Sequence, residues 1–211
     1  MRKFTTVFAL LLLGVFFVYN EMSAQASDEG LIGKEAPGFN LKNIDGEMVS
    51  LASYLEADDV EGVIVIFTCN HCPYAKMYED RIVALDKKYK EMGYPVIAIN
   101  PNDPTAYPED DFDNMVDRAA QKGFTFPYLV DGSQEVAHAY QATRTPHNYV
   151  LHKEDGQFLI RYVGAIDDSP REASDVEETF LEDAIEALKK GKAPSTAYTK
   201  AVGCSIKWKK S

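Results

Sequence analysis

The chain has 211 residues, 45% of them apolar, so it can bury the core of one well-packed domain and is too short for two typical domains. It carries 22 basic and 33 acidic side chains, a formal net charge of −11. Such a surface would repel nucleic acid, and we therefore expect no nucleic-acid partner.

The first segment has the pattern of a secretory signal peptide. Two basic residues precede an apolar run over 7–19, which is shorter than the about 20 residues that a membrane-spanning helix needs. Ala24 and Ala26 follow in the A-x-A pattern of a cleavage site. We expect residues 1–26 to be removed, leaving a domain over 27–211 that is periplasmic or otherwise extracytoplasmic and not stably inserted in a membrane. The alternative is an uncleaved anchor.

The first elements of the domain can be placed from turn residues and apolar runs. Asp45-Gly46 is typical of the turn of a β-hairpin. The run GVIVIFT (62–68) is apolar throughout, which predicts a central strand buried on both faces. Pro73 fits the first turn of a helix, and apolar residues then recur at helical spacing until Gly93, a plausible helix stop.

The later elements follow from the same signals. They are expected, in chain order, as a strand over 94–100, a helix over 112–122, a strand over 127–131, a short helix over 134–140, two strands over 147–164 joined through Asp155-Gly156, a helix over 172–190 and a polar tail over 192–211. Alternating strands and helices predict an α/β domain with a partly parallel sheet and helices on both faces.

Two of the three cysteines, Cys69 and Cys72, lie between the buried strand and the following helix, with His71 between them. In open α/β sheets, sites form at this end of the strands. The exposed N–H groups of the helix start, and a protonated His71, would favour a thiolate. We expect Cys69 to be the attacking thiolate and Cys72 the more buried, resolving thiol.

Two other interpretations of this pair remain open. One is a purely structural disulfide, although so short a loop contributes little stability. The other is a metal clip made by Cys69, His71, Cys72 and His147, with copper considered because Met77 lies about one turn further along.

A second motif is ATRTPHNYV (142–150), in which Thr145-Pro146 directly precedes a predicted strand. A cis bond at Pro146 would turn the chain sharply and bring its backbone against the cysteine pair. Arg144 could bind an acidic group of a substrate, although a plain surface role is favoured.

These motifs, together with IGKEAPGFNLKNIDGE, YPVIAINPND and TKAVGCSIKW, resemble the thioredoxin-like redoxins over roughly residues 32–208. The most similar group is the peroxiredoxin-like branch of the AhpC/TSA proteins, near the exported oxidoreductases of the TlpA/ResA type. The resemblance implies a thioredoxin fold, a central mixed β-sheet flanked by helices, with an N-terminal β-hairpin extension. It also implies a cis Pro146, with Cys69 as nucleophile and Cys72 as resolving thiol.

The chain departs from this pattern in two places. With either Cys69 or Cys72 taken as the peroxidatic cysteine, the Pro and the Thr/Ser of the peroxiredoxin motif P-x-x-x-[TS]-x-x-C are absent. Val63 stands where thioredoxins hold a buried acid, so proton transfer would use water, His71 or His147 instead.

The third cysteine and several aromatic residues have open roles. Cys204 could be a buried small residue, a free thiol or a third redox thiol that folds back to the pair. Phe67 and Tyr74 could form an apolar rim for a substrate or belong to the core. Trp208 is expected to anchor the tail on the domain, and His138 to pack on the surface.

The sequence therefore predicts an exported thiol–disulfide oxidoreductase that exchanges disulfides with protein substrates. It would need no cofactor beyond the redox-active disulfide Cys69–Cys72. The His before the second cysteine indicates a potential more oxidising than that of a thioredoxin. The alternatives are a peroxide-reducing redoxin and a copper- or zinc-binding module.

Overall fold

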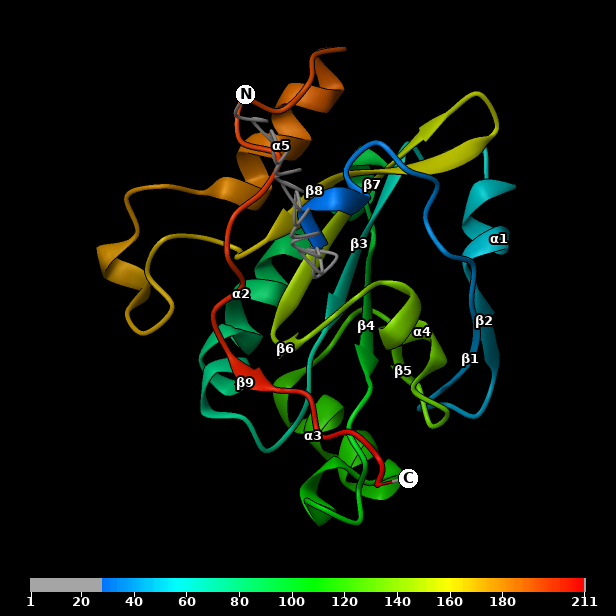
Figure 1. Cartoon of the computed structure of the whole chain (residues 1–211), viewed down its shortest axis with the longest axis vertical. Helices are drawn as coiled ribbons and strands as arrows, with labels where there is room; N and C mark the ends of the chain where they lie inside the picture. Colours follow the sequence, from blue (N-terminus) through cyan, green and yellow to red (C-terminus); the bar gives the residue numbers. More distant parts are fainter. Residues whose placement is uncertain (1–27, 211) are drawn as a thin grey trace, which may run out of the picture.

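The computed structural model describes residues 28–210, so the predicted signal peptide over 1–26 lies outside the described residues. A seven-stranded sheet runs through the domain in the order β2-β1-β5-β4-β3-β7-β8 (Figure 1). Its strands are β1 (Asn40–Asn43), β2 (Met48–Ser50), β3 (Gly62–Phe67), β4 (Val96–Asn100), β5 (Tyr128–Val130), β7 (His147–Glu154) and β8 (Gln157–Gly164). The strands β3, β4 and β5 are parallel, and the other pairs are antiparallel. The predicted mixed α/β sheet is confirmed.

Within residues 28–210, five helices accompany the sheet, and three of them are long enough to cover a face. They are α1 (Leu51–Leu55), α2 (Pro73–Tyr89), α3 (Phe112–Lys122), α4 (Glu135–Ala139) and α5 (Phe180–Lys189). Short 3₁₀ turns stand at Asp28–Leu31, Lys90–Met92, Pro108–Asp110 and Ala173–Asp175. Among residues 28–210, no helix is long and apolar enough to cross a membrane.

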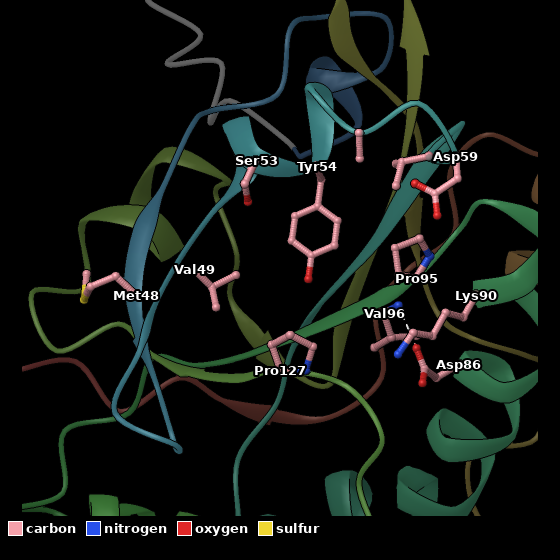
Figure 2. Close-up of a pocket in the computed structure, with 12 residues that line it drawn as sticks. Met48, Val49, Ser53, Tyr54, Asp59, Asp86, Lys90, Pro95, Val96 and Pro127 are labelled. Carbon is pink, nitrogen blue, oxygen red and sulfur yellow. Dashed lines mark hydrogen bonds between the residues drawn. The ribbon is translucent and has the colours of Figure 1, made fainter.

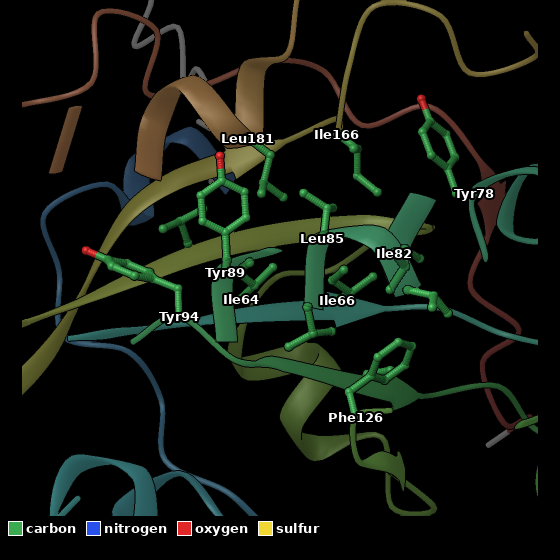
Figure 3. Close-up of a cluster of buried hydrophobic side chains, with 14 of the residues drawn as sticks. Ile64, Ile66, Tyr78, Ile82, Leu85, Tyr89, Tyr94, Phe126, Ile166 and Leu181 are labelled. Carbon is green, nitrogen blue, oxygen red and sulfur yellow. The ribbon is translucent and has the colours of Figure 1, made fainter. Parts of the chain in front are cut away.

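The central strand β3 separates two hydrophobic clusters, as its continuous apolar sequence predicts. Ile64 and Ile66 face the hydrophobic cluster that lies under α2, α3 and α5. Figure 3 shows these two side chains with Tyr89 and Leu181 of the same cluster. The alternate residues of β3 face the second cluster, to which α1 and α4 contribute. Because all six residues of β3 are buried, the strand is a fixed platform for the loop that follows it.

The connection from β3 to α2 carries the C-x-x-C motif in the expected place. Cys72 is the N-cap of α2 with an extended backbone, and Pro73 is the first helical residue, where its missing N–H costs nothing. The helical segment ends at Gly93, whose φ of 82° is left-handed and favours glycine.

One prediction for the C-terminal part is wrong. The last helix begins at Phe180 and not at residue 172, because hydrogen bonds hold Glu177 and Glu178 against Asp168. The Glu177 N–H donates to the Asp168 carboxylate at 3.0 Å. The Asp168 N–H donates to the Glu178 carbonyl at 3.2 Å. The polar tail over 192–211 is assigned no strand by its sequence. It contains β9 (Cys204–Ser205), which pairs with β6 (Arg144–Thr145) just before Pro146.

Candidate active site

The C-x-x-C loop and the predicted proline turn meet at one edge of the sheet. β3 and β7 are antiparallel with Phe67 opposite His147, so the end of β3 lies beside the turn that precedes β7. The Thr145–Pro146 peptide bond in that turn is cis, which confirms the predicted geometry. Three segments far apart in sequence therefore converge: the loop after β3, the β6–β7 turn and β9 (Figure 1).

Thr145 touches both sulfurs of the pair. Its hydroxyl Oγ1 lies 3.2 Å from Cys69 Sγ, and its carbonyl oxygen lies 3.1 Å from Cys72 Sγ. Cys69 is 2% exposed and Cys72 is fully buried, and both are free thiols. Both residues are buried, so neither sulfur is openly accessible.

In the dithiol form, the pKa values of the two sulfurs depend on each other, because each sulfur is the hydrogen-bond partner of the other. The pKa of Cys72 is lowered to about 4, first because the Cys69 thiol donates a hydrogen bond to it and then because the Cys204 thiol and the N–H of Ala75 also point at it. The pKa of Cys69 is raised, because its proton is held by Cys72, because it is buried, and because the Asp110 carboxylate opposes a second negative charge. The two sulfurs therefore share one negative charge at the helix start.

His71 connects Cys69 to a buried carboxylate. Its Nδ1 lies 3.6 Å from Cys69 Sγ and 2.5 Å from Asp110 Oδ2. Asp110 is 4% exposed and also accepts hydrogen bonds from the backbone N–H groups of Asn70 and His71 and from the Asn102 amide. These donors hold the carboxylate beside the imidazole, at the position where it can orient the ring and exchange a proton with it.

Asp110 was not found by sequence reasoning, which placed 101–110 in a loop without a role. An acid is absent at position 63 within β3, and the acid of this site, Asp110, comes instead from the connection after β4. The available signal was topological. Since β3 and β4 are parallel neighbours, the loops after both lie at the same edge, and an acidic residue in the second loop can reach the first.

Aromatic and basic side chains border the His71 ring. Tyr107 stacks on it with ring centroids 4.0 Å apart and planes 12° from parallel. The Lys207 ammonium lies over the Tyr107 ring, 5.3 Å from its centroid. Tyr107 is 39% exposed, so a surface ring covers one face of the imidazole while the buried carboxylate binds its edge.

The third cysteine joins the site through β9. Cys204 stands opposite Thr145 in the β6–β9 register and packs, partly exposed, against the cluster of Cys69, Cys72 and Ala75. Burial and the hydrogen bond to Cys72 raise the pKa of Cys204 to about 11. Of the roles left open for it, the buried small residue is excluded by its partial exposure.

The alternative of a metal clip made by Cys69, His71, Cys72 and His147 is not assembled. His147 is buried elsewhere, with its Nε2 2.9 Å from an Asp28 carboxylate oxygen. Within residues 28–210, one atom each from Cys69, His71 and Asp110 lie within 4.8 Å of one another, a set that could hold a metal ion. The Nδ1 of His71 is engaged with Asp110 at 2.5 Å, so a metal ion would have to replace that hydrogen bond.

The remaining side chains singled out by sequence divide between core and surface. Phe67 is fully buried against Tyr140 and therefore belongs to the core, not to a substrate rim. Tyr74 is partly exposed and packs against the cysteine cluster. Arg144 is exposed at the edge of the β6–β9 pair, which fits the surface role. Trp208 stacks on His138 with centroids 4.1 Å apart and anchors the tail as predicted.

A cavity lies away from the thiols. It has a volume of about 390 Å³ and opens beneath α1, where the Tyr54 ring points into it from above Pro127 and Val96 (Figure 2). Val96 begins β4 and Pro127 precedes β5, so the cavity is at the amino ends of the parallel strands, opposite the C-x-x-C loop. No cysteine lines it.

Comparison with known proteins agrees with this geometry. Residues 32–168 match the family model described as AhpC/TSA family. The thiol–disulfide oxidoreductase ResA of Halalkalibacterium halodurans is 29% identical over 159 residues, covering 74% of this chain and 84% of the relative. A crystal structure of an uncharacterized conserved protein from Geobacillus kaustophilus is 38% identical, with a TM-score of 0.77 and coverage of 85% and 93% of the two chains.

A thiol:disulfide interchange protein of the thioredoxin family from Chlorobium tepidum superposes with a TM-score of 0.52 at 20% identity, over 64% of this chain and 88% of that one, which shows the shared fold. The predicted thioredoxin fold and the predicted enzyme class, a thiol–disulfide oxidoreductase, are confirmed. The chain belongs to the AhpC/TSA family.

Proposed function

We propose that the protein is an exported thiol–disulfide oxidoreductase that exchanges disulfides with protein substrates through the pair Cys69–Cys72. The observation that carries this is the convergence of both sulfurs on Thr145, next to the cis bond to Pro146. The pair supplies two electrons and the site needs no further cofactor for this exchange.

The reaction begins from the dithiol with its shared charge. Cys69 transfers its proton to Cys72, and the Cys69 thiolate attacks one sulfur of a substrate disulfide. The substrate bond breaks, a mixed disulfide forms at Cys69, and the leaving substrate sulfur is protonated. Cys72 gives the proton that it had received to this leaving sulfur, and its thiolate then attacks Cys69. This forms the Cys69–Cys72 disulfide and releases the second substrate sulfur as a thiolate, which takes a proton from solvent so that the substrate leaves as a dithiol. The reverse sequence oxidises a substrate.

The surrounding residues position the sulfurs and handle the proton. His71 is the nearest titratable ring to Cys69, at 3.6 Å, and Asp110 fixes its orientation. Together they offer the proton route that the missing acid at Val63 would otherwise supply. The Thr145 hydroxyl lies 3.2 Å from Cys69 Sγ, where it would donate a hydrogen bond once Cys69 is a thiolate. Pro146 holds the turn that presents both Thr145 contacts.

The proposed location and partners rest on other features. The apolar run over 7–19 and the A-x-A pattern support export. The curated relatives are named as thiol–disulfide oxidoreductases, which supports protein thiols and disulfides as substrates. Peroxide reduction is not favoured, because the pair lacks the Pro and Thr of the peroxidatic motif.

The direct test is to trap the mixed disulfide. Cys72→Ser should leave Cys69 joined to native partners, which are identified by mass spectrometry after reduction of the isolated complexes. The matched control is the double variant Cys69→Ser/Cys72→Ser, which keeps only Cys204. Capture by the first and not by the second supports the proposal, whereas equal capture by both, or by neither, contradicts it.

A further inference from the structure

The burial of the C-x-x-C pair leaves a problem for exchange with folded proteins. Cys69 has 2% of its surface exposed and Cys72 has none, so a disulfide between them offers almost no sulfur to an external thiol. Disulfide exchange requires the attacking sulfur to approach along the S–S axis, so access controls its rate. A more accessible sulfur in contact with the pair would remove this restriction.

Cys204 has that position. β9 pairs with β6 so that Thr145 is opposite Cys204, and the same Thr145 carbonyl contacts Cys72 Sγ at 3.1 Å. Cys204 packs against the cysteine cluster and is partly exposed, unlike the other two sulfurs. Cys72 is therefore in contact with both Cys69 and Cys204.

The backbone holds this approach closely. A Cβ on Gly203 would lie 2.3 Å from the Thr145 carbonyl oxygen, so only glycine allows β9 to come this near the turn. On the other side of Cys204, the Ile206 N–H donates to the Thr143 carbonyl at 3.1 Å. The backbone on both sides of Cys204 is thus held against the site by specific contacts, and these fix the position of its sulfur.

Resting on the function proposed above, we propose that Cys204 is a third redox thiol that exchanges with the pair at Cys72. The Cys204 thiolate attacks Cys72 Sγ of the Cys69–Cys72 disulfide. The Cys72–Cys204 bond forms, the Cys69–Cys72 bond breaks, and Cys69 leaves as a thiolate that takes up the proton lost by Cys204. The step is an isomerisation with no net oxidation, and it moves one sulfur of the disulfide to the surface.

A protein dithiol can then reduce the enzyme at Cys204. Its thiolate attacks Cys204 Sγ, forms a mixed disulfide there and releases Cys72 as the thiolate. The second thiol of the partner resolves the mixed disulfide and leaves the enzyme with three free thiols. Two electrons pass from the partner to the enzyme, as they would in a direct attack on the pair.

The charges around Cys204 favour its ionisation when Cys69 and Cys72 form a disulfide. In the dithiol form, the charge on Cys72 opposes ionisation of Cys204, while Arg144 and Lys207 favour it. Once Cys69 and Cys72 are joined, the charge on Cys72 is gone and the two cations remain. Cys204 therefore ionises more readily in the oxidised state, the only state that contains a disulfide for it to attack.

Tryptic peptides distinguish the two disulfides without ambiguity. Cleavage after Lys42 and Lys76 gives a peptide over 43–76 that contains both Cys69 and Cys72, whereas cleavage after Lys200 and Lys207 gives 201–207 with Cys204 alone. The full-length protein is reduced, freed of reductant, oxidised with diamide at low concentration, blocked with N-ethylmaleimide in acidic guanidinium and digested. Monomer isolated without reductant is analysed, so a link between 43–76 and 201–207 is intramolecular.

Two variants carry the test. Cys69→Ser should form the link between 43–76 and 201–207, and Cys204→Ser should form only a disulfide within 43–76. In the oxidised wild type, the single maleimide should be found on Cys69 in a fraction of the molecules and on Cys204 in the rest. This last readout needs no substitution and so does not depend on how a variant folds.

The outcomes separate the two proposals. If Cys204→Ser forms its disulfide but Cys69→Ser forms no intramolecular link, or if wild type is labelled at Cys204 only, the third thiol is rejected and the oxidoreductase proposal stands. If Cys204→Ser forms no disulfide within 43–76, the proposed function itself fails. A link found only in dimers also rejects the exchange within one chain.

Discussion

The Oγ1 of Thr145 lies 3.2 Å from Cys69 Sγ, and the carbonyl oxygen of the same residue lies 3.1 Å from Cys72 Sγ. Because the backbone of Thr145 also pairs with Cys204, one residue contacts all three cysteines. The side chain and the main chain of Thr145 act on different sulfurs, so they can be tested separately by substitution of the side chain alone.

Thr145→Val should raise the pKa of Cys69, because the hydroxyl that lowers it is lost while a side chain of similar size remains. The measurement is the pH dependence of thiolate ultraviolet absorbance in a Cys72→Ser/Cys204→Ser background, where Cys69 titrates alone. The matched control is Thr143→Val, at an exposed position two residues earlier, which should leave the titration unchanged. An unchanged Cys69 titration in Thr145→Val would show that the hydroxyl does not act on this sulfur.

Asp110→Asn should have the opposite effect on the same sulfur. The carboxylate opposes a negative charge on Cys69, so its replacement by an amide should lower the pKa of Cys69 in the same background. Asp111→Asn is the control, since Asp111 caps α3 and asparagine caps equally well. Because Asp110 also accepts from two backbone N–H groups, the variant should lose about 1–3 kcal/mol of unfolding free energy. A pKa of Cys69 that rises in Asp110→Asn would contradict this electrostatic account.

The pH dependence of stability should differ between the reduced protein and a variant without the pair. The folded pKa of Cys72, about 4, is below its ordinary value of 9.0, so its stabilisation is complete above pH 9 and is lost as pH falls toward 4. The raised pKa of Cys69 acts oppositely, removing stability only as pH rises above 9. The unfolding free energy of the reduced wild type, minus that of Cys69→Ser/Cys72→Ser, should therefore increase between about pH 5 and pH 8. Urea unfolding with a phosphine reductant measures both; parallel curves would refute the shared thiolate.

Much of the fold could be predicted because its signals are local. The continuous apolar run of β3, Pro73 after the cysteine pair and Thr145-Pro146 before a strand each define a structure within a few residues. The start of the last helix was missed because Asp168 fixes residues 177 and 178 from outside the segment, and helical periodicity does not report such contacts.

The site was predicted less completely than the fold, because two of its parts come from distant segments. Asp110 reaches His71 from the loop after β4, and Cys204 reaches Cys72 only through the β6–β9 pairing. The influences on the pKa of Cys69 could be predicted only in part, for a related reason. Motif reasoning included the helix start and His71, but not the carboxylate opposite Cys69 or the donors at Cys72.

Gly203→Ala should displace β9 from the turn, because the new Cβ would lie 2.3 Å from the Thr145 carbonyl oxygen. Clashes of this kind with backbone cost typically about 1–3 kcal/mol. The control is Gly132→Ala, whose Cβ would meet only a Val130 methyl at 3.8 Å and should change stability by less than about 0.5 kcal/mol. Urea unfolding gives the free energies. Equal stability of the two variants would mean that β9 is not held against Thr145 as described.

The reduction potential of the pair should be above that of thioredoxin, about −270 mV, because a stabilised thiolate favours the reduced form. The Cys204 thiol is one of the donors to Cys72, and Cys204→Ala removes it without adding another. Loss of a hydrogen bond to a charged group costs about 1.5–3 kcal/mol, so the potential should fall by about 30–60 mV. The control is Val202→Ala, at an exposed neighbouring position, which should leave the potential unchanged. Equilibration with glutathione, followed by mass analysis of the peptide over 43–76, measures the Cys69–Cys72 couple in each variant. A wild-type value at or below about −270 mV would show that the charge on Cys72 is not stabilised in the dithiol form.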